Sequence, residues 1–124
     1  MAKILVIDDE QGIRNLLHTL LRRKGYDVIL ADSGEHGLEF FRRYRPDVIV
    51  LDLKMPGMDG LTVLQQVHSL NPQQPVIMLT GAGTPEAEFQ ARALGVTEFV
   101  EKEFSLHLLG DALTRLLNDP VTAT

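Results

Sequence analysis

The stretch VIVLDLKMPGMDG, residues 48–60, joins four aliphatic residues to a carboxylate, Asp52, and then to a Pro-Gly turn. A short aliphatic run bounded by turn residues is typical of a strand that is covered on both faces, as in a parallel sheet. Asp52 therefore follows the last residue of a buried strand. The ends of the other strands indicate why an apolar strand should lead into an acid.

The same pattern recurs along the chain, and each strand-like run is followed by a segment with helical periodicity. The predicted strands are Lys3–Ile7, Asp27–Ala31, Asp47–Leu51, Pro75–Leu79 and Thr97–Val100. Alternating strands and helices imply right-handed crossovers and a parallel sheet. We therefore predict an α/β fold, a (βα)5 doubly wound five-stranded parallel sheet with strand order 2-1-3-4-5 and helices on both faces.

Local capping signals predict two of the helix boundaries. Asp32 and Glu35 have the spacing of a capping box, so the second helix is predicted to open at Asp32. The last helix is predicted to end before Asn118, because an Asn-Asp-Pro sequence begins there and proline commonly follows a helix end.

The length of 124 residues suits a single domain with one continuous core. We assign residues 1–119 to this domain and residues 120–124 to a short C-terminal tail. The chain has no cysteine, which excludes disulfides and thiolate metal sites. Because no apolar run is long enough for a signal peptide or a membrane span, we expect a cytoplasmic protein that does not bind membranes.

The charged residues indicate no nucleic-acid surface, since the net charge is -5. Two basic clusters, Arg22-Arg23-Lys24 and Arg42-Arg43-Tyr44-Arg45, fall where helices should end. Cations at that position complement the helix dipole, so we interpret both clusters as solvated helix ends. The dispersed histidines are interpreted as surface helix residues rather than zinc ligands; they are His18, His36, His68 and His107.

Polar side chains follow four of the five predicted strands, namely Asp8 and Asp9, Asp52, Thr80 and Lys102. The carboxyl ends of parallel strands share one edge of the sheet, which is where such folds bind ligands. Three neighbouring carboxylates repel one another unless a cation lies among them, and Mg²⁺ prefers oxygen ligands of this kind. An aspartate nucleophile, Mg²⁺, a hydroxyl and a lysine suffice for phosphoryl transfer, so we predict that Asp52 accepts a phosphoryl group.

Four motifs in order, ILVIDDEQGIR, DVIVLDLKMPGMDGL, VIMLTGAG and ALGVTEFVEKEF, resemble the receiver domains of two-component response regulators. The resemblance implies a phosphoprotein of a phosphorelay that takes phosphate from a histidine kinase or phosphotransfer protein, and not a turnover enzyme. It implies output through the surface of helix 4, strand 5 and helix 5, toward an effector domain or a second copy. The implied roles are Asp52 as phosphoacceptor, Asp8, Asp9 and the Lys54 carbonyl as further metal ligands, Thr80 and Phe99 as switch residues, and Lys102 as phosphate counter-charge.

Three alternatives remain open from the residues. A haloacid-dehalogenase-type phosphatase also has a strand-end aspartate, but its general acid would stand where this chain has Lys54. A receiver that acts only through protein interaction is expected to lack part of the site, whereas here Asp52, Lys102 and the acid pair are all present. A nucleotide-binding domain is disfavoured because the segment TGAGT lacks a phosphate-binding glycine spacing.

Two details concern the segment around the fifth strand. Phe89 is predicted to point outward on its helix, because Ala87, Ala91 and Leu94 form the stripe that faces the sheet; the alternative is that Phe89 folds against a neighbouring helix. The family usually has proline after the lysine, often with a cis bond, and this chain has Glu103. A cis bond before a non-proline residue costs about 2.5–4 kcal/mol, so we expect the Lys102-Glu103 bond to be trans.

Overall fold

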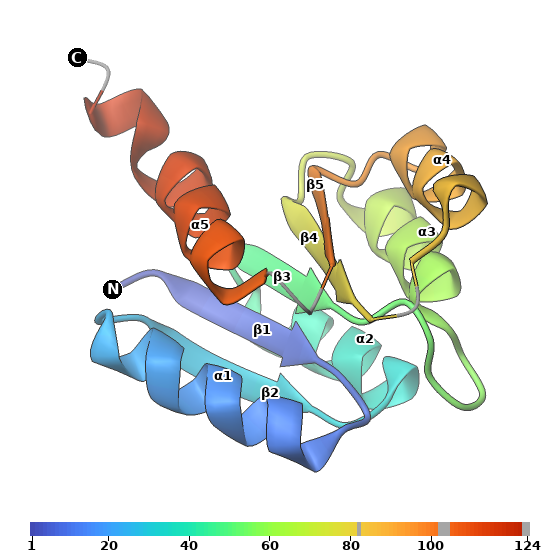
Figure 1. Cartoon of the computed structure of the whole chain (residues 1–124), viewed down its shortest axis with the longest axis horizontal. Coiled ribbons are helices and arrows are strands. Elements are labelled where there is room, and N and C mark those ends of the chain that lie inside the picture. The colour runs from blue at the N-terminus through green and yellow to red at the C-terminus, as the bar shows by residue number, and fades with distance from the viewer. Residues whose placement is uncertain (82, 102–104, 123–124) are drawn as a thin grey trace.

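A single parallel sheet of five strands forms the centre of the molecule in the computed structural model, which describes residues 1–81, 83–101 and 105–122 (Figure 1). The strand order is β2-β1-β3-β4-β5, as predicted. The strands are β1 (Lys3–Ile7), β2 (Asp27–Ala31), β3 (Val48–Leu51), β4 (Val76–Thr80) and β5 (Glu98–Glu101). All neighbouring strands pair in parallel, so their carboxyl ends meet at one edge.

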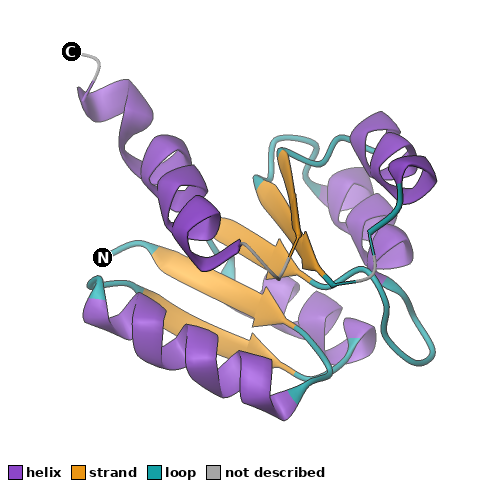
Figure 2. Ribbon diagram, viewed as in Figure 1, coloured by secondary structure: helices purple, strands orange, loops and turns teal. Residues whose placement is uncertain are grey.

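Five helices cover the two faces of the sheet, with α1 and α5 on one face and α2, α3 and α4 on the other (Figures 1 and 2). Their bounds are α1 (Gln11–Arg23), α2 (Gly34–Tyr44), α3 (Gly60–Leu70), α4 (Pro85–Ala93) and α5 (Ser105–Thr122). Within the described ranges, none of these helices combines the length and the apolar composition needed to cross a membrane. The α/β fold with helices on both faces is therefore confirmed.

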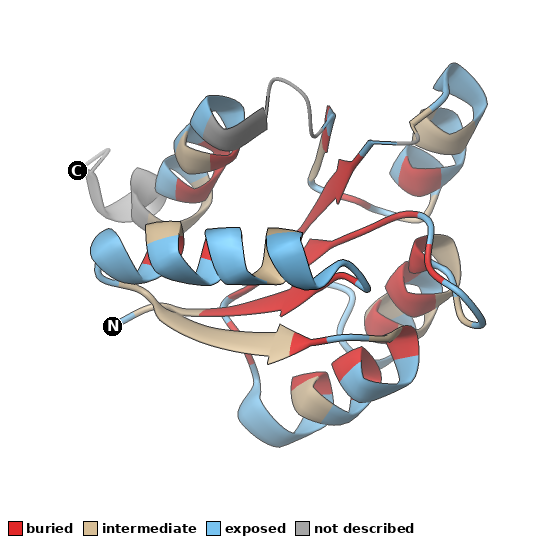
Figure 3. Cartoon of the chain, turned by 60° about the horizontal axis from the view of Figure 1, so that its bottom comes forward, coloured by how far each residue is buried: buried red, intermediate tan, exposed pale blue. Residues whose placement is uncertain are grey.

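The strand residues alternate between two hydrophobic clusters, one on each face of the sheet. In β3, Ile49 and Leu51 pack with α2 and α3, whereas Val48 and Val50 pack with α1 and α5. Both sets are fully buried, which explains why the strands are aliphatic at every position rather than at alternate ones (Figure 3). The outer strand β2 is mostly half-buried.

Two helix boundaries differ from the prediction. Ser33, not Asp32, caps α2, because its hydroxyl accepts a hydrogen bond from the His36 amide at 3.1 Å. The Asp32 carboxylate instead contacts the His36 ring at 2.5 Å, and one carboxylate cannot serve both positions well. Helix α5 continues past Asn118 to Thr122. Proline removes one backbone donor but has a helical φ angle, so it weakens the last turn without excluding it.

The interpretation of the histidines is correct for His18, His36 and His107, which are exposed, and wrong for His68. The half-buried ring of His68 lies between two backbone carbonyl oxygens, those of Leu94 and Gln74, each 2.8 Å from a ring nitrogen. His68 thus connects the end of α3 to the segment before β4 and to the end of α4. Its role is structural, because both ring nitrogens are used in these contacts.

Candidate functional site

Asp8 and Asp52 stand directly after β1 and β3, two neighbouring interior strands of the sheet. The Asp52 amide donates to the Ile7 carbonyl at 2.9 Å, and the Asp8 amide donates to the Ala31 carbonyl at 3.1 Å. These bonds extend the strand pairing by one residue, so both acids are held by the sheet itself. Asp8 is 2% exposed and Asp52 is 5% exposed. Such deep burial is unusual for aspartate and indicates a specific role.

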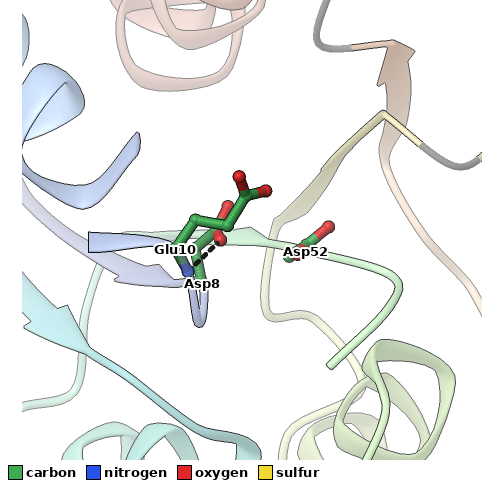
Figure 4. A group of neighbouring side chains, drawn as sticks. All are labelled: Asp8, Glu10 and Asp52. Atoms are coloured by element: carbon green, nitrogen blue, oxygen red, sulfur yellow. Dashed lines mark hydrogen bonds between the residues drawn. The ribbon is translucent and has the colours of Figure 1, made fainter. Parts of the chain in front are cut away.

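A third acid joins them, and it is Glu10. The carboxylate oxygens of Asp8, Glu10 and Asp52 all lie within 4.8 Å of one another (Figure 4). Asp8 is oriented by the Glu10 amide, which donates to its Oδ1 at 2.9 Å, and by Arg14, whose Nη1 donates to the Asp8 carbonyl oxygen at 2.8 Å. Three clustered carboxylates are a set of hard oxygen donors, which is the chemistry that divalent cations require.

Asp9, predicted as a metal ligand, is exposed and lies outside this group. Glu10 has an extended backbone with φ −87° and ψ 114°, where it caps α1. Asp9 lies in a bend between them, and the hydrogen bond from the Glu10 amide to Asp8 Oδ1 closes this turn, so Asp8 and Glu10 come together while Asp9 is exposed. The run Asp8-Asp9-Glu10 contains this third acid, but its position depends on the turn after β1, which no pattern in the sequence specifies.

The loop after Asp52 is shaped by close backbone packing at Gly60. A Cβ atom added there would lie 2.2 Å from the Asp52 carbonyl oxygen and 2.8 Å from the Leu53 Cα. The Gly60 amide donates to the Leu53 carbonyl at 2.8 Å, which closes the loop, and Asp59 caps α3 by accepting from the Thr62 amide. The segment Met-Pro-Gly-Met-Asp-Gly therefore returns the chain tightly against the residue that follows β3.

Thr80 and Phe99 lie on neighbouring strands beside this edge. Thr80 is the last residue of β4 and is fully buried. Phe99 is half-buried in β5 and packs against the cluster on the α2–α4 face. Gly83 lies between them: a Cβ atom there would be 3.0 Å from the Phe99 ring and 3.4 Å from the Thr80 methyl group. The threonine and the aromatic ring thus both border the space that a side chain at Gly83 would occupy.

Three other residues named in the sequence analysis are Lys54, Lys102 and Phe89. Lys54 is exposed in the loop after Asp52. Lys102 and the Lys102-Glu103 peptide bond lie outside the described residues. Phe89 points outward on α4 and is 74% exposed, so its predicted orientation is confirmed and the alternative of a buried ring is wrong.

An exposed histidine and aspartate form a pair near the same edge, where β2 ends. The hydrogen bond between the Asp32 carboxylate and the His36 ring raises the pKa of His36 and lowers the pKa of Asp32. The negative charges of Asp32, Glu39 and Glu35 also favour the protonated ring. The pair is exposed on both sides, so solvent screens it strongly.

Comparison with known proteins identifies the domain. The family model described as "Response regulator receiver domain" matches residues 4–114. The chain belongs to the response regulator receiver family. Receiver domains of this family are phosphoacceptors rather than turnover enzymes, which decides against the phosphatase alternative.

Individual relatives of this receiver domain differ in length. It is 33% identical over 115 residues to sporulation initiation phosphotransferase F of Bacillus subtilis and covers 93% of each chain. It is 44% identical over 103 residues, 83% of this chain, to the probable transcriptional regulator ycf27 of Porphyridium aerugineum, of which it spans only 42%. The solved structure of TrrA from Thermotoga maritima, in complex with Mg²⁺ and BeF, has 33% identity and a TM-score of 0.87 and covers 94% of this chain and all of that one.

Proposed function

We propose that Asp52 takes a phosphoryl group from a phosphohistidine of a histidine kinase or phosphotransfer protein. An Asp52 carboxylate oxygen attacks phosphorus, the O–P bond forms as the P–N bond breaks, and the imidazole leaves. The observation that supports this most is the convergence of Asp8, Glu10 and Asp52 at the edge of the sheet where such folds bind ligands. Thr80 and Lys102 are proposed to contact the phosphoryl oxygens, the first with a hydroxyl and the second with a positive charge.

Mg²⁺ fits the donor set, because three carboxylates within 4.8 Å supply oxygen ligands and excess negative charge. Asp8, Asp52 and the Lys54 carbonyl are its proposed ligands, and the bound ion would neutralise charge on the transferred group. The family resemblance implies Asp9 as a further carboxylate ligand of Mg²⁺, whereas the geometry favours Glu10 for that role. These two assignments predict different effects of substitution.

The proposed output is a change at the α4–β5–α5 surface that depends on Thr80 and Phe99. The closeness of both residues to Gly83, just before α4, supports a connection between the phosphoacceptor edge and the start of α4. Through this surface the domain is proposed to bind an effector domain or a second copy, without contacting nucleic acid or membrane itself. We propose a cytoplasmic location, with which the cysteine-free sequence is compatible.

The test is phosphorylation by acetyl phosphate, followed by intact-mass measurement. One phosphate is expected on the wild-type chain in Mg²⁺, and none on Asp52→Asn or in EDTA. The Mg²⁺ concentration needed for half-maximal phosphorylation then separates the two metal assignments: Glu10→Gln raises it if Glu10 is a ligand, and Asp9→Asn raises it if Asp9 is. Phosphorylation of Asp52→Asn to the wild-type level would contradict the proposal.

A further inference from the structure

A pocket formed by the described residues lies at the amino edge of the sheet, opposite the acidic group. It has a volume of about 530 Å³ and lies between the end of α2 and the end of α3. Pro46 precedes β3 and Gln74 precedes β4, which places the pocket where these strands begin. Its size is within the range of small-molecule sites.

One part of the pocket is apolar. Phe41 and Pro46 are buried in its wall, and Leu70 is 57% exposed although it is a large aliphatic residue. A flat apolar group placed here would cover the Leu70 side chain and contact the ring of Phe41. Such a group would remove apolar surface from water, which is the main favourable term in most small-molecule binding.

The other part is cationic. Arg42 and Arg45 line the pocket and are exposed, and within the ranges that the structure describes neither guanidinium forms an ion pair or a hydrogen bond. The chain as a whole has a net charge of -5, whereas the surface beside this pocket has two unpaired arginines and is therefore locally positive. Arginine binds carboxylate, phosphate and related anions through two parallel hydrogen bonds.

Arg45 also has an uncommon backbone conformation. Its φ of 49° makes it the only non-glycine residue with positive φ in the described part of the chain. The turns that end α1 and α4 have glycine in this region, Gly25 and Gly95, because glycine adopts it without steric cost. An arginine at such a position, unlike glycine, adds backbone strain but supplies a charged side chain. Strained positions of this kind cluster at ligand sites.

We propose that this pocket binds a small organic anion with a flat apolar body. The apolar body packs against Phe41 and Leu70, and a carboxylate, phosphate or sulfonate group lies between Arg42 and Arg45. The basic cluster Arg42-Arg43-Tyr44-Arg45 is then part of a ligand site rather than only a solvated helix end. The site is independent of phosphorylation at Asp52, which belongs to the opposite edge of the sheet.

A suitable probe is 1-anilinonaphthalene-8-sulfonate, which combines an aromatic body with one sulfonate, compared with the neutral N-phenyl-1-naphthylamine. Binding is followed by fluorescence and by amide chemical shifts. In the wild-type chain we expect the sulfonate to bind more tightly than the neutral compound and to shift the amides of Phe41, Arg45, Leu70 and Asn71. Arg42→Gln/Arg45→Gln should weaken sulfonate binding about tenfold or more and leave binding of the neutral compound nearly unchanged.

Two matched variants complete the test. Arg22→Gln/Arg23→Gln removes the same charge from the end of α1 and should keep wild-type affinity. Arg45→Gly should lower sulfonate affinity while the melting temperature stays the same or rises, because glycine relieves the positive φ. Equal loss of affinity in both double variants would overturn the proposal, since it would indicate a general charge effect. Shifts centred on Leu20 and Gly110, which line a smaller apolar pocket between α1 and α5, would also overturn it.

Discussion

At the carboxyl edge of the sheet, Asp8 and Asp52 are buried, and their carboxylate oxygens lie within 4.8 Å of that of Glu10. At the amino edge, by contrast, Arg42 and Arg45 are exposed to solvent. Strand pairing fixes the backbones of Asp8 and Asp52 side by side. The arginines stand at and just after the end of α2, where the helix dipole favours cations and water screens them. The crowded negative charge at the carboxyl edge is therefore expected to lower stability, whereas the positive charge at the amino edge is expected to have little effect on stability.

The largest effect is expected from Gly60→Ala. The added methyl group would overlap the Asp52 carbonyl oxygen, which belongs to backbone that cannot move without displacing the strand end. We expect a loss of about 3 kcal/mol or more in the free energy of unfolding, measured by urea denaturation. The control is Gly12→Ala in α1, where nothing lies within 4 Å of the added atom. It should gain about 0.5–1 kcal/mol. Equal stability of Gly60→Ala and wild type would show that the carboxyl edge is looser than described.

The next effect concerns repulsion within the acidic group. In EDTA, Asp52→Asn should raise the free energy of unfolding by on the order of 1–3 kcal/mol, because it removes repulsion with Asp8 and Glu10. Asp9→Asn should change it by less than about 0.5 kcal/mol, since Asp9 lies outside the group. Mg²⁺ should stabilise the wild-type chain more than Asp52→Asn. If Asp52→Asn melts at a lower temperature than wild type in EDTA, repulsion among the three carboxylates does not destabilise the fold.

At the amino edge, stability is expected to depend on contacts such as those that His68 makes with backbone carbonyl oxygens. His68→Leu removes the contacts of the two ring nitrogens with the carbonyl oxygens of Leu94 and Gln74, including the hydrogen bond that the ring N–H donates, and should cost about 1–2 kcal/mol in the free energy of unfolding. His18→Leu, on the exposed side of α1, should stay within about 0.5 kcal/mol of wild type. If both substitutions have the same effect, the two contacts of His68 do not contribute to stability.

The smallest effect is the pH dependence of the His36–Asp32 pair. Because the hydrogen bond to Asp32 raises the pKa of His36 in the folded chain, its stabilisation is complete below the unfolded value of about 6.5 and disappears as the pH rises through the folded pKa. Because the same bond lowers the pKa of Asp32, the stabilisation is also lost as the pH falls through that lowered value.

The melting temperature of His36→Gln should therefore lie slightly below that of wild type at pH 5.5 and coincide with it at pH 9. NMR titration of the His36 ring checks the direction of its pKa. A lowered pKa for His36, or a difference in melting temperature that grows toward pH 9, would contradict the pairing.

Sequence patterns alone predict the order of strands and helices and the edge at which the acids meet. Continuous aliphatic runs such as residues 48–51 specify strands buried on both faces, and the parallel topology then brings the residues after the strands together. The bounds of β1 and β2 were predicted without error for the same reason. These features depend on local periodicity and on the chirality of crossovers, both of which are encoded in short segments.

The pairs of side chains that come together depend on the three-dimensional packing of the chain. Glu10 rather than Asp9 joins Asp8 and Asp52 because the dihedral angles of the turn after β1 set the side-chain directions. His68 contacts the carbonyl oxygen of Leu94, and Arg42 and Arg45 line one pocket with Leu70, although these residues are distant in the sequence. No local pattern specifies such pairs, because they depend on how helix ends from different parts of the chain are packed against one sheet.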